Sequence, residues 1–183
     1  MLLEQFRTNF PPDSEIPALL IQLLDYQNAT ADWYSGRFEL TGYGANDTVA
    51  WFDGDTEAAT QFVPFGAGPD GSSYCYWLYP GRSLATAPIV FLRSEGVACT
   101  VLTNTTEEFL ALLAIGYKEL GFADLNQPEP DTTNVLRFRA WLQTEFGIHT
   151  PQRGAEIIAQ AKARHPDLEQ WIQMWAKARY GTD

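Results

Sequence analysis

Residues 61–113 read QFVPFGAGPDGSSYCYWLYPGRSLATAPIVFLRSEGVACTVLTNTTEEFLALL, a run of short apolar segments separated by turn residues. The apolar segments are rich in β-branched and aromatic residues, and the intervening ones carry glycine and proline, as in strands joined by tight connections. We expect strands over residues 61–65, 73–79, 89–92 and 98–102. Their close spacing predicts an antiparallel meander.

Turn and capping residues divide this stretch further. Glu95-Gly96 reads as the hairpin turn between the last two strands, and Pro64 marks a sheet edge or a strand end because it has no N–H for the ladder. Thr105 and Glu108 have the spacing of a capping box. They predict a helix that covers the sheet and ends at Gly121.

The preceding residues predict one buried helix and two more strands. Leucines at helical spacing lie within residues 15–26, and Pro17 fits the first turn of that helix. Residues 38–40 and 49–52 read as short strands, the second closed by the turn Asp53-Gly54-Asp55. The fold class is therefore α+β, with an antiparallel sheet of about five to six strands, an N-terminal helix and a covering helix.

The character of the chain changes after residue 125. A polar connector with two prolines leads into three segments with helical periodicity, at residues 135–146, 151–164 and 166–180. Thr150-Pro151 reads as the cap and first turn of the second. We expect an α+β domain over residues 1–125 and a helical extension over 126–183, packed on or beside it.

Composition places the chain among ordinary globular proteins. It has 183 residues, 45% of them hydrophobic, and no apolar run approaching the roughly 20 residues that span a bilayer. The first residues lack the apolar core of a signal peptide, which indicates a cytoplasmic protein with no membrane partner. Cys75 and Cys99 both fall in predicted strands, where small buried thiols are expected.

The charge is strongly uneven along the chain. The net charge is −11, and residues 1–125 hold 16 acids and 5 bases, whereas residues 126–183 hold 7 of each. Between Asp13 and Asp70 ten acids accompany a single base, Arg37. Such a field repels phosphate, which excludes nucleic acid as a direct partner, and it favours a basic protein. A solvated acidic surface without a partner is the alternative.

No motif for catalysis or for a cofactor emerges. Residues 66–71 match a dinucleotide-binding spacing, but Pro69 removes an N–H donor and a strand follows instead of a helix. Residues 53–57 resemble part of a calcium loop that lacks its glycine. His149 and His165 lie beside predicted helix ends, where capping or surface roles are typical. We therefore expect no cofactor, no metal and no enzymatic activity.

Two groups of aromatic residues leave alternatives open. Tyr74, Tyr76 and Trp77 lie in a strand that is either buried on both faces or exposed as a recognition strip. Trp171 and Trp175 share a helical face, which indicates core packing in preference to a partner-binding stripe.

The order of these elements resembles the SUKH superfamily, which includes fungal regulators of glucan synthesis and bacterial immunity proteins. The resemblance covers residues 10–120 and rests on FVPFG at 62–66, Asp70-Gly71, PIVFL at 88–92 and Thr105-x-x-Glu108-Phe109-Leu110. Trp33-Tyr34-Ser35-Gly36 matches its tryptophan and glycine pattern in part. The resemblance implies an α+β fold and a cytoplasmic antitoxin that neutralises a polymorphic toxin, often a nuclease.

The charge and the resemblance together predict a protein-binding surface. Its acids would mimic phosphates toward a basic toxin domain, and its aromatic residues would anchor the contact. The predicted partner-binding residues are Asp47, Trp51, Phe52, Asp53, Asp55, Glu57 and Asp70. The alternative is a regulatory or scaffold protein, of cell-wall synthesis or another pathway, that binds a cytosolic protein with no toxin involved.

Overall fold

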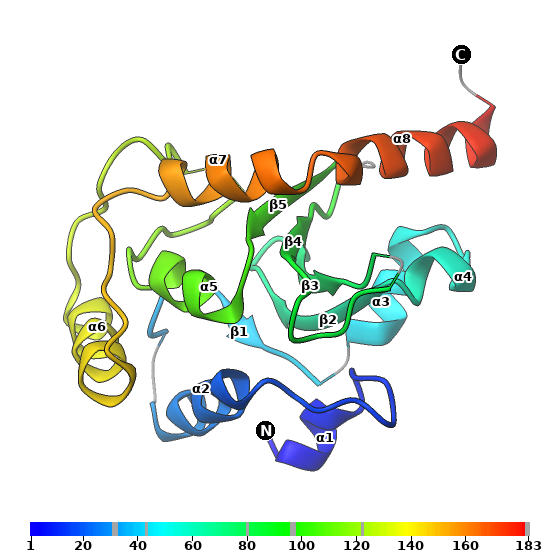
Figure 1. The fold of residues 1–183 in the computed structure, drawn as a ribbon. Helices are drawn as coiled ribbons and strands as arrows, with labels where there is room; N and C mark the ends of the chain where they lie inside the picture. Colours follow the sequence, from blue (N-terminus) through cyan, green and yellow to red (C-terminus); the bar gives the residue numbers. More distant parts are fainter. Residues whose placement is uncertain (31–32, 43, 80, 96–97, 122, 182–183) are drawn as a thin grey trace.

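A five-stranded antiparallel sheet lies at the centre of the molecule (Figure 1). The computed structural model describes all residues except 31–32, 43, 80, 96–97, 122 and 182–183. Each described strand pairs with its neighbour in sequence, which confirms the predicted meander. The strands are β1 (Glu39–Leu40), β2 (Phe62–Ala67), β3 (Ser73–Trp77), β4 (Ile89–Leu92) and β5 (Cys99–Thr103).

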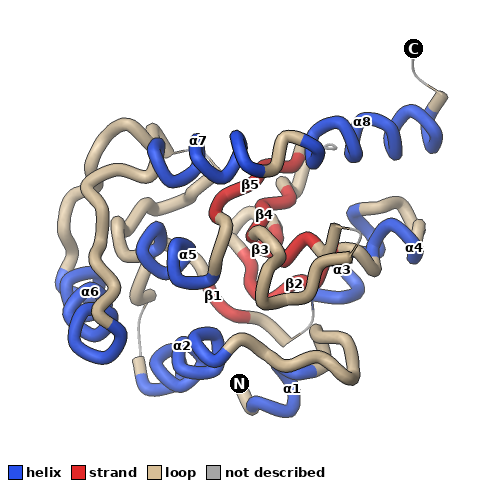
Figure 2. The backbone as a smooth tube through the Cα atoms, viewed as in Figure 1, coloured by secondary structure: helices blue, strands red, loops and turns tan. Residues whose placement is uncertain are grey.

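Helices surround this sheet, as the tube in Figure 2 shows. Together with the antiparallel strands they confirm the predicted α+β class, its N-terminal helix and its C-terminal helices. The helices of the described chain are α1 (Leu3–Arg7), α2 (Ala18–Ala29), α3 (Gly44–Trp51), α4 (Thr56–Ala59), α5 (Thr106–Leu113), α6 (Thr133–Phe146), α7 (Ala155–Arg164) and α8 (Asp167–Tyr180). None of them is long and apolar enough to cross a membrane.

The sheet is covered on both faces. Tyr74 and Tyr76 of β3 point into a core that also takes in side chains of α2, α5 and α6. Cys75 and Trp77, the alternate residues of the same strand, point into a second core with Phe52 and side chains of α8. Because successive side chains of a strand face opposite ways, two apolar faces require helices on both sides.

Pro64 lies inside β2, at a local edge of the sheet and not at a strand end. It pairs with Cys75 of β3, and the register shifts between Pro64 and Gly66, which marks a bulge. The neighbouring strand β1 pairs only with Gly66 and Ala67. Pro64 therefore stands beyond the reach of β1, where its missing N–H leaves no ladder bond unmade.

Residues 49–52 form no strand, contrary to the sequence prediction. They belong to the end of α3 and the turn after it, and the N–H of Phe52 donates to the carbonyl of Thr48 at 3.1 Å. Thr48 and Phe52 are both buried, whereas Ala50 is exposed. This burial follows the four-residue spacing of a helix face packed on the sheet. The turn Asp53-Gly54-Asp55 accordingly joins two helices and closes no hairpin.

Three predicted helix boundaries are also wrong. The covering helix α5 begins as predicted, with the Thr105 hydroxyl accepting from the N–H of Glu108 at 3.1 Å. The Glu108 carboxylate, however, accepts from the N–H of Asn104, so the capping box is only half formed. Helix α5 ends at Leu113, well before Gly121.

The other two wrong boundaries are helix starts. Helix α7 begins after Gly154, so Thr150-Pro151 lies outside it. Pro17 is the N-cap that precedes α2, which begins at Ala18, and so it does not lie within the first turn as predicted.

The C-terminal helices pack against the sheet and its first core. Helix α7 lies along β5 at the edge of the sheet, and α8 continues past it toward the C-terminus (Figure 1). Phe138 and Leu142 of α6 are fully buried in the core that holds Tyr74 and Tyr76. The boundary near residue 125 stays a prediction, because these contacts show where the helices lie and not which part folds alone.

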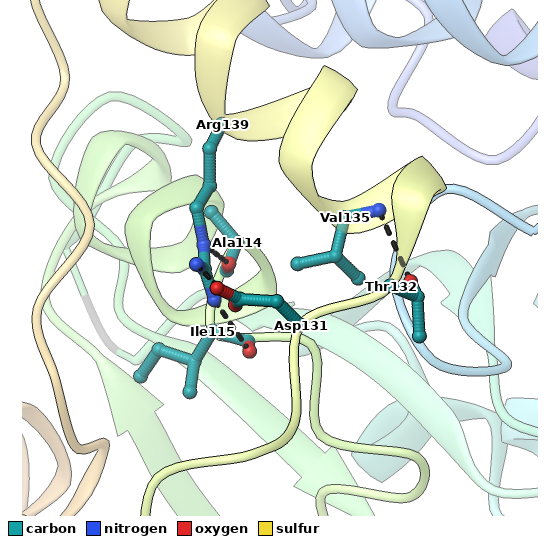
Figure 3. Close-up of polar contacts among 6 residues, drawn as sticks. All are labelled: Ala114, Ile115, Asp131, Thr132, Val135 and Arg139. Carbon is teal, nitrogen blue, oxygen red and sulfur yellow. Dashed lines mark hydrogen bonds and ion pairs between the residues drawn. The ribbon is translucent and has the colours of Figure 1, made fainter.

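Arg139 joins α6 to the end of α5 (Figure 3). Its Nε donates to the carbonyl of Ala114 at 2.7 Å, and its Nη2 donates to the carbonyl of Ile115 at 3.1 Å. Its Nη1 forms an ion pair with Asp131 in the connector. One guanidinium thus binds the carbonyls that follow the last turn of α5, where a cation is favoured by the helix dipole.

The two cysteines are unlinked thiols, and the predicted hairpin turn lies partly outside the described residues. Cys75 is fully buried and Cys99 is half-buried. Burial raises the pKa of both thiols, so neither is a reactive thiolate at neutral pH. The predicted turn is Glu95-Gly96, and Gly96 is among the residues that the structure does not describe.

Candidate functional site

The predicted partner-binding residues fall on α3, α4 and two turns. We use "acidic surface" for Asp47, Asp53, Asp55, Glu57 and Asp70. Asp47 lies in the first turn of α3 and Glu57 in the first turn of α4, and both are exposed. The N-terminal turn of a helix favours an anion, so both carboxylates also stabilise the helix that carries them.

Asp53 is held in an uncommon backbone conformation by the turn between α3 and α4. Its φ is +49°, and Gly54 follows at +81°. Its N–H donates to the carbonyl of Ala50 at 3.0 Å. The left-handed region favours glycine, and aspartate is among the few other residues that enter it. The Asp53 carboxylate therefore projects from a turn whose conformation is held by backbone hydrogen bonds.

Arg179 of α8 reaches this turn from the far end of the sequence. Its Nε donates to Oδ2 of Asp53 at 3.1 Å, and its Nη2 donates to the Asp53 carbonyl at 2.7 Å. The two charged side chains are about half exposed, at 43% and 59%. An ion pair this exposed contributes little to stability, about 1 kcal/mol at most. The charge of Asp53 is thus partly neutralised by Arg179, and replacing Arg179 by another cation would cost little free energy.

Asp55 accepts two hydrogen bonds from other parts of the molecule. Its Oδ1 accepts from the N–H of Ala58 at 3.0 Å and caps α4. Its Oδ2 accepts from the indole N–H of Trp175 at 3.0 Å. The Ala58 hydrogen bond, and next the Trp175 hydrogen bond, lower the pKa of Asp55 from its ordinary value. The carboxylate is therefore anionic at neutral pH and fixed in place.

The two aromatic residues of the predicted surface differ sharply. Trp51 is half-buried, and its indole N–H donates to the carbonyl of Arg93 at 2.7 Å. Its ring stacks on that of Trp175, with centroids 6.2 Å apart. Phe52 is 0% exposed and packs in the second core against Phe62. Phe52 is therefore a core residue and no surface anchor, because the helical path of residues 44–51 turns it onto the sheet.

Asp70 lies in the turn between β2 and β3. Its Oδ1 accepts from the hydroxyl of Ser72 at 2.5 Å, and its Oδ2 accepts from the hydroxyl of Ser94 at 3.3 Å. Burial raises the pKa of this carboxyl, but the Ser72 and Ser94 hydrogen bonds outweigh it, and the pKa lies below its ordinary value. Ser94 follows Arg93, which binds Trp51. Two adjacent residues thus connect Asp70 with the α3 end of the acidic surface.

Asp47 and Glu57 are the members of the acidic surface that form no ion pair with any described residue. No side chain in the described part of the chain forms an ion pair with either carboxylate. Asp53, Asp55 and Asp70, by contrast, are bound by donors from α8 or from nearby serines. Asp47 and Glu57 are therefore the carboxylates most open to another molecule.

The other candidate sites from the sequence are aromatic side chains and metal ligands, and the structure supports neither kind as a binding site within the described residues. Tyr74, Tyr76 and Trp77 are each at most 3% exposed, so the aromatic strand is no recognition strip. Trp171 and Trp175 are half-buried and pack against Phe52, in agreement with the predicted core packing. Within the described ranges, no three His, Cys, Asp or Glu side chains are placed to hold a metal ion.

Sequence reasoning missed the residues of α8 that meet the acidic surface. Trp175 and Arg179 stand one helical turn apart, which places both on one side of α8. Their distance along the chain from Asp53 and Asp55 hid the contact. The available signal is modest: a basic residue, Arg179, lies at i+4 from Trp175, a tryptophan whose helical spacing indicates core packing.

No protein-family model, curated protein or solved structure matches this chain. The resemblance to the SUKH superfamily accordingly stays a prediction.

Proposed function

We propose that this chain is a non-enzymatic protein-binding module, an immunity protein that neutralises a cognate basic toxin through its acidic surface. One observation carries the proposal: Asp47 and Glu57 are exposed and unpaired in the described structure, within a stretch that has ten acids to one base. The sequence resemblance to a superfamily of toxin-immunity proteins points the same way.

The electrostatics favour fast capture of a basic partner. The hydrogen bonds that lower the pKa of Asp55 and of Asp70 keep both carboxylates charged at neutral pH. A surface of one charge raises association rates by about 10- to 1000-fold, and the gain falls as salt is added. Nucleic acid fits this surface poorly, because its phosphates carry the same charge. A basic protein is the complementary partner.

The internal contacts favour some carboxylates over others as the contacts of a partner. Asp53 and Asp55 already bind Arg179 and Trp175, so reversing their charge would break these contacts with α8 as well as change the surface. Asp47 and Glu57 make no such contact with the part of the chain that the structure describes. The partner's basic side chains therefore meet Asp47 and Glu57 first, and they compete with Arg179 for Asp53.

A pull-down with three baits tests the proposal. The baits are the wild-type chain, the double variant Asp47→Lys/Glu57→Lys, and the control Glu156→Lys/Glu169→Lys. The control also reverses two exposed acids in first helical turns, on α7 and α8, and so matches the test variant in net charge and in its effect on helix dipoles.

The proposal predicts that the wild-type chain and the control capture a basic protein from a lysate of the source cells, and that the Asp47/Glu57 variant does not. The captured protein should inhibit growth when expressed alone and lose that effect when co-expressed with the wild-type chain. A captured protein without toxicity would favour the regulatory or scaffold alternative. Equal capture by all three baits would refute the role of the acidic surface.

A further inference from the structure

His165 is a buried histidine at the corner between two helices. It is 7% exposed, and its backbone N–H donates to the carbonyl of Ala161 at 3.0 Å, at the end of α7. Pro166 follows and precedes α8, so the two helices cannot continue as one. Figure 1 shows α7 and α8 meeting at this corner above the sheet.

Arg82 binds the ring of His165 from the segment between β3 and β4. Its Nη1 lies 2.7 Å from Nδ1 of His165, and its guanidinium lies 5.4 Å from the centre of the Tyr79 ring. An arginine can only donate, so Nδ1 is the acceptor and the ring proton sits on Nε2. The contact therefore requires a neutral histidine.

The surroundings disfavour protonation of His165. Burial is the largest effect, and the charges of Arg82 and Arg164 add to it, while Asp167 and Glu108 act in the opposite direction. The carboxyl end of α7 also favours a cation. The net result is that the pKa of His165 lies below its ordinary value of 6.5.

We infer that the Arg82–His165 hydrogen bond is an acid-sensitive latch that fastens the α7–α8 corner to the β3–β4 segment. A proton on Nδ1 removes the acceptor and places two cations in contact. The hydrogen bond then breaks, and the corner loses this polar attachment to the β3–β4 segment.

Helix α8 is the element that this loss would loosen. Only Leu168 and Ile172 of α8 are buried, and the helix leads to the C-terminal end of the chain (Figure 1). Segments with few buried contacts open locally before the rest of a protein unfolds. Because α8 also carries Trp175 and Arg179, opening would release Asp55 and Asp53.

The sign of the pH dependence follows from linkage. The closed corner holds His165 with a lowered pKa, whereas the open corner lets it titrate near 6.5. The latch is therefore fully stabilising above pH 6.5 and is lost as the pH falls through the lower, closed-state value. Within that window, opening increases by up to about tenfold per pH unit.

Amide hydrogen exchange tests the latch in the full-length protein. Protection factors of α8 are compared at about pH 7.5 and about pH 5, with intrinsic rates corrected, in the wild type, His165→Gln and His149→Gln. Glutamine keeps an acceptor for Arg82 but does not titrate. We expect the wild type and the His149→Gln control to lose α8 protection in acid, and His165→Gln to keep it.

Equal acid loss in the wild type and in His165→Gln, or no loss in either, would overturn the inference. If His165→Gln fails to fold, the wild type alone still decides. The ring resonances of His165 should titrate with a midpoint below 6.5 that coincides with the loss of α8 protection. A midpoint at or above 6.5 contradicts a neutral, arginine-bound ring.

Discussion

The indole N–H of Trp175 donates to a carboxylate oxygen of Asp55 at 3.0 Å, across 120 residues of sequence. The same carboxylate caps α4 through the N–H of Ala58. One side chain thus fixes the start of a short helix and the end of a long one. The acidic surface is therefore built partly from acids that the fold itself uses.

Asp55 gives the first prediction. Asp55→Ala removes both the cap and the acceptor for Trp175, whereas Asp55→Asn keeps an oxygen that can cap α4. Both variants should unfold at lower urea than the wild type, and Asp55→Ala should unfold at the lowest. The order is read from urea midpoints at neutral pH. Indistinguishable midpoints would show that neither hydrogen bond matters for stability.

A second prediction concerns Arg139. Arg139→Ala leaves the carbonyls of Ala114 and Ile115 without their donor, and it should lower the free energy of unfolding by about 2 kcal/mol. Arg137→Ala on the same helix removes an exposed arginine and serves as the control. Urea denaturation of both variants provides the comparison. An Arg139→Ala protein as stable as its control would contradict the contacts in Figure 3.

Glycine substitutions provide a third prediction. A Cβ at Gly36 would clash with the carbonyl oxygen of Tyr117, at a φ of +49°, so Gly36→Ala should cost about 3 kcal/mol or more. Gly147 also has a positive φ, but a Cβ there meets nothing within 4 Å. Gly147→Ala should therefore cost only the backbone strain, about 1 kcal/mol. Thermal or urea unfolding distinguishes the two, and equal losses would mean that the close approach at Gly36 is not rigid.

The strands could be predicted because their residues carry the pattern themselves. Residues 74–79 alternate between two apolar sets, each rich in aromatic side chains, which is typical of a strand covered on both faces. Residues 49–52 carry equally β-prone side chains and yet end a helix. Packing of Thr48 and Phe52 on the sheet outweighs local propensity there, and a single sequence contains no record of that packing.

The candidate site was predictable only in part. The four acids of residues 47–57 stand out by charge alone, and all four remain at least partly exposed in the fold. Their partners in α8 could not be read from the sequence, because Arg179 and Trp175 approach through the tertiary fold. Phe52 was misplaced for the same reason: its exposure depends on α3, which the sequence did not predict.

The association rate constant with the captured partner tests the central claim most directly. It is measured by surface-coupled kinetics at low and at high salt for the wild type, for Asp47→Lys/Glu57→Lys and for the Glu156→Lys/Glu169→Lys control. At low salt, the Asp47/Glu57 variant should associate about tenfold more slowly than the other two, and the difference should shrink as salt is added. Identical association rate constants for all three proteins at low salt would contradict binding through the acidic surface.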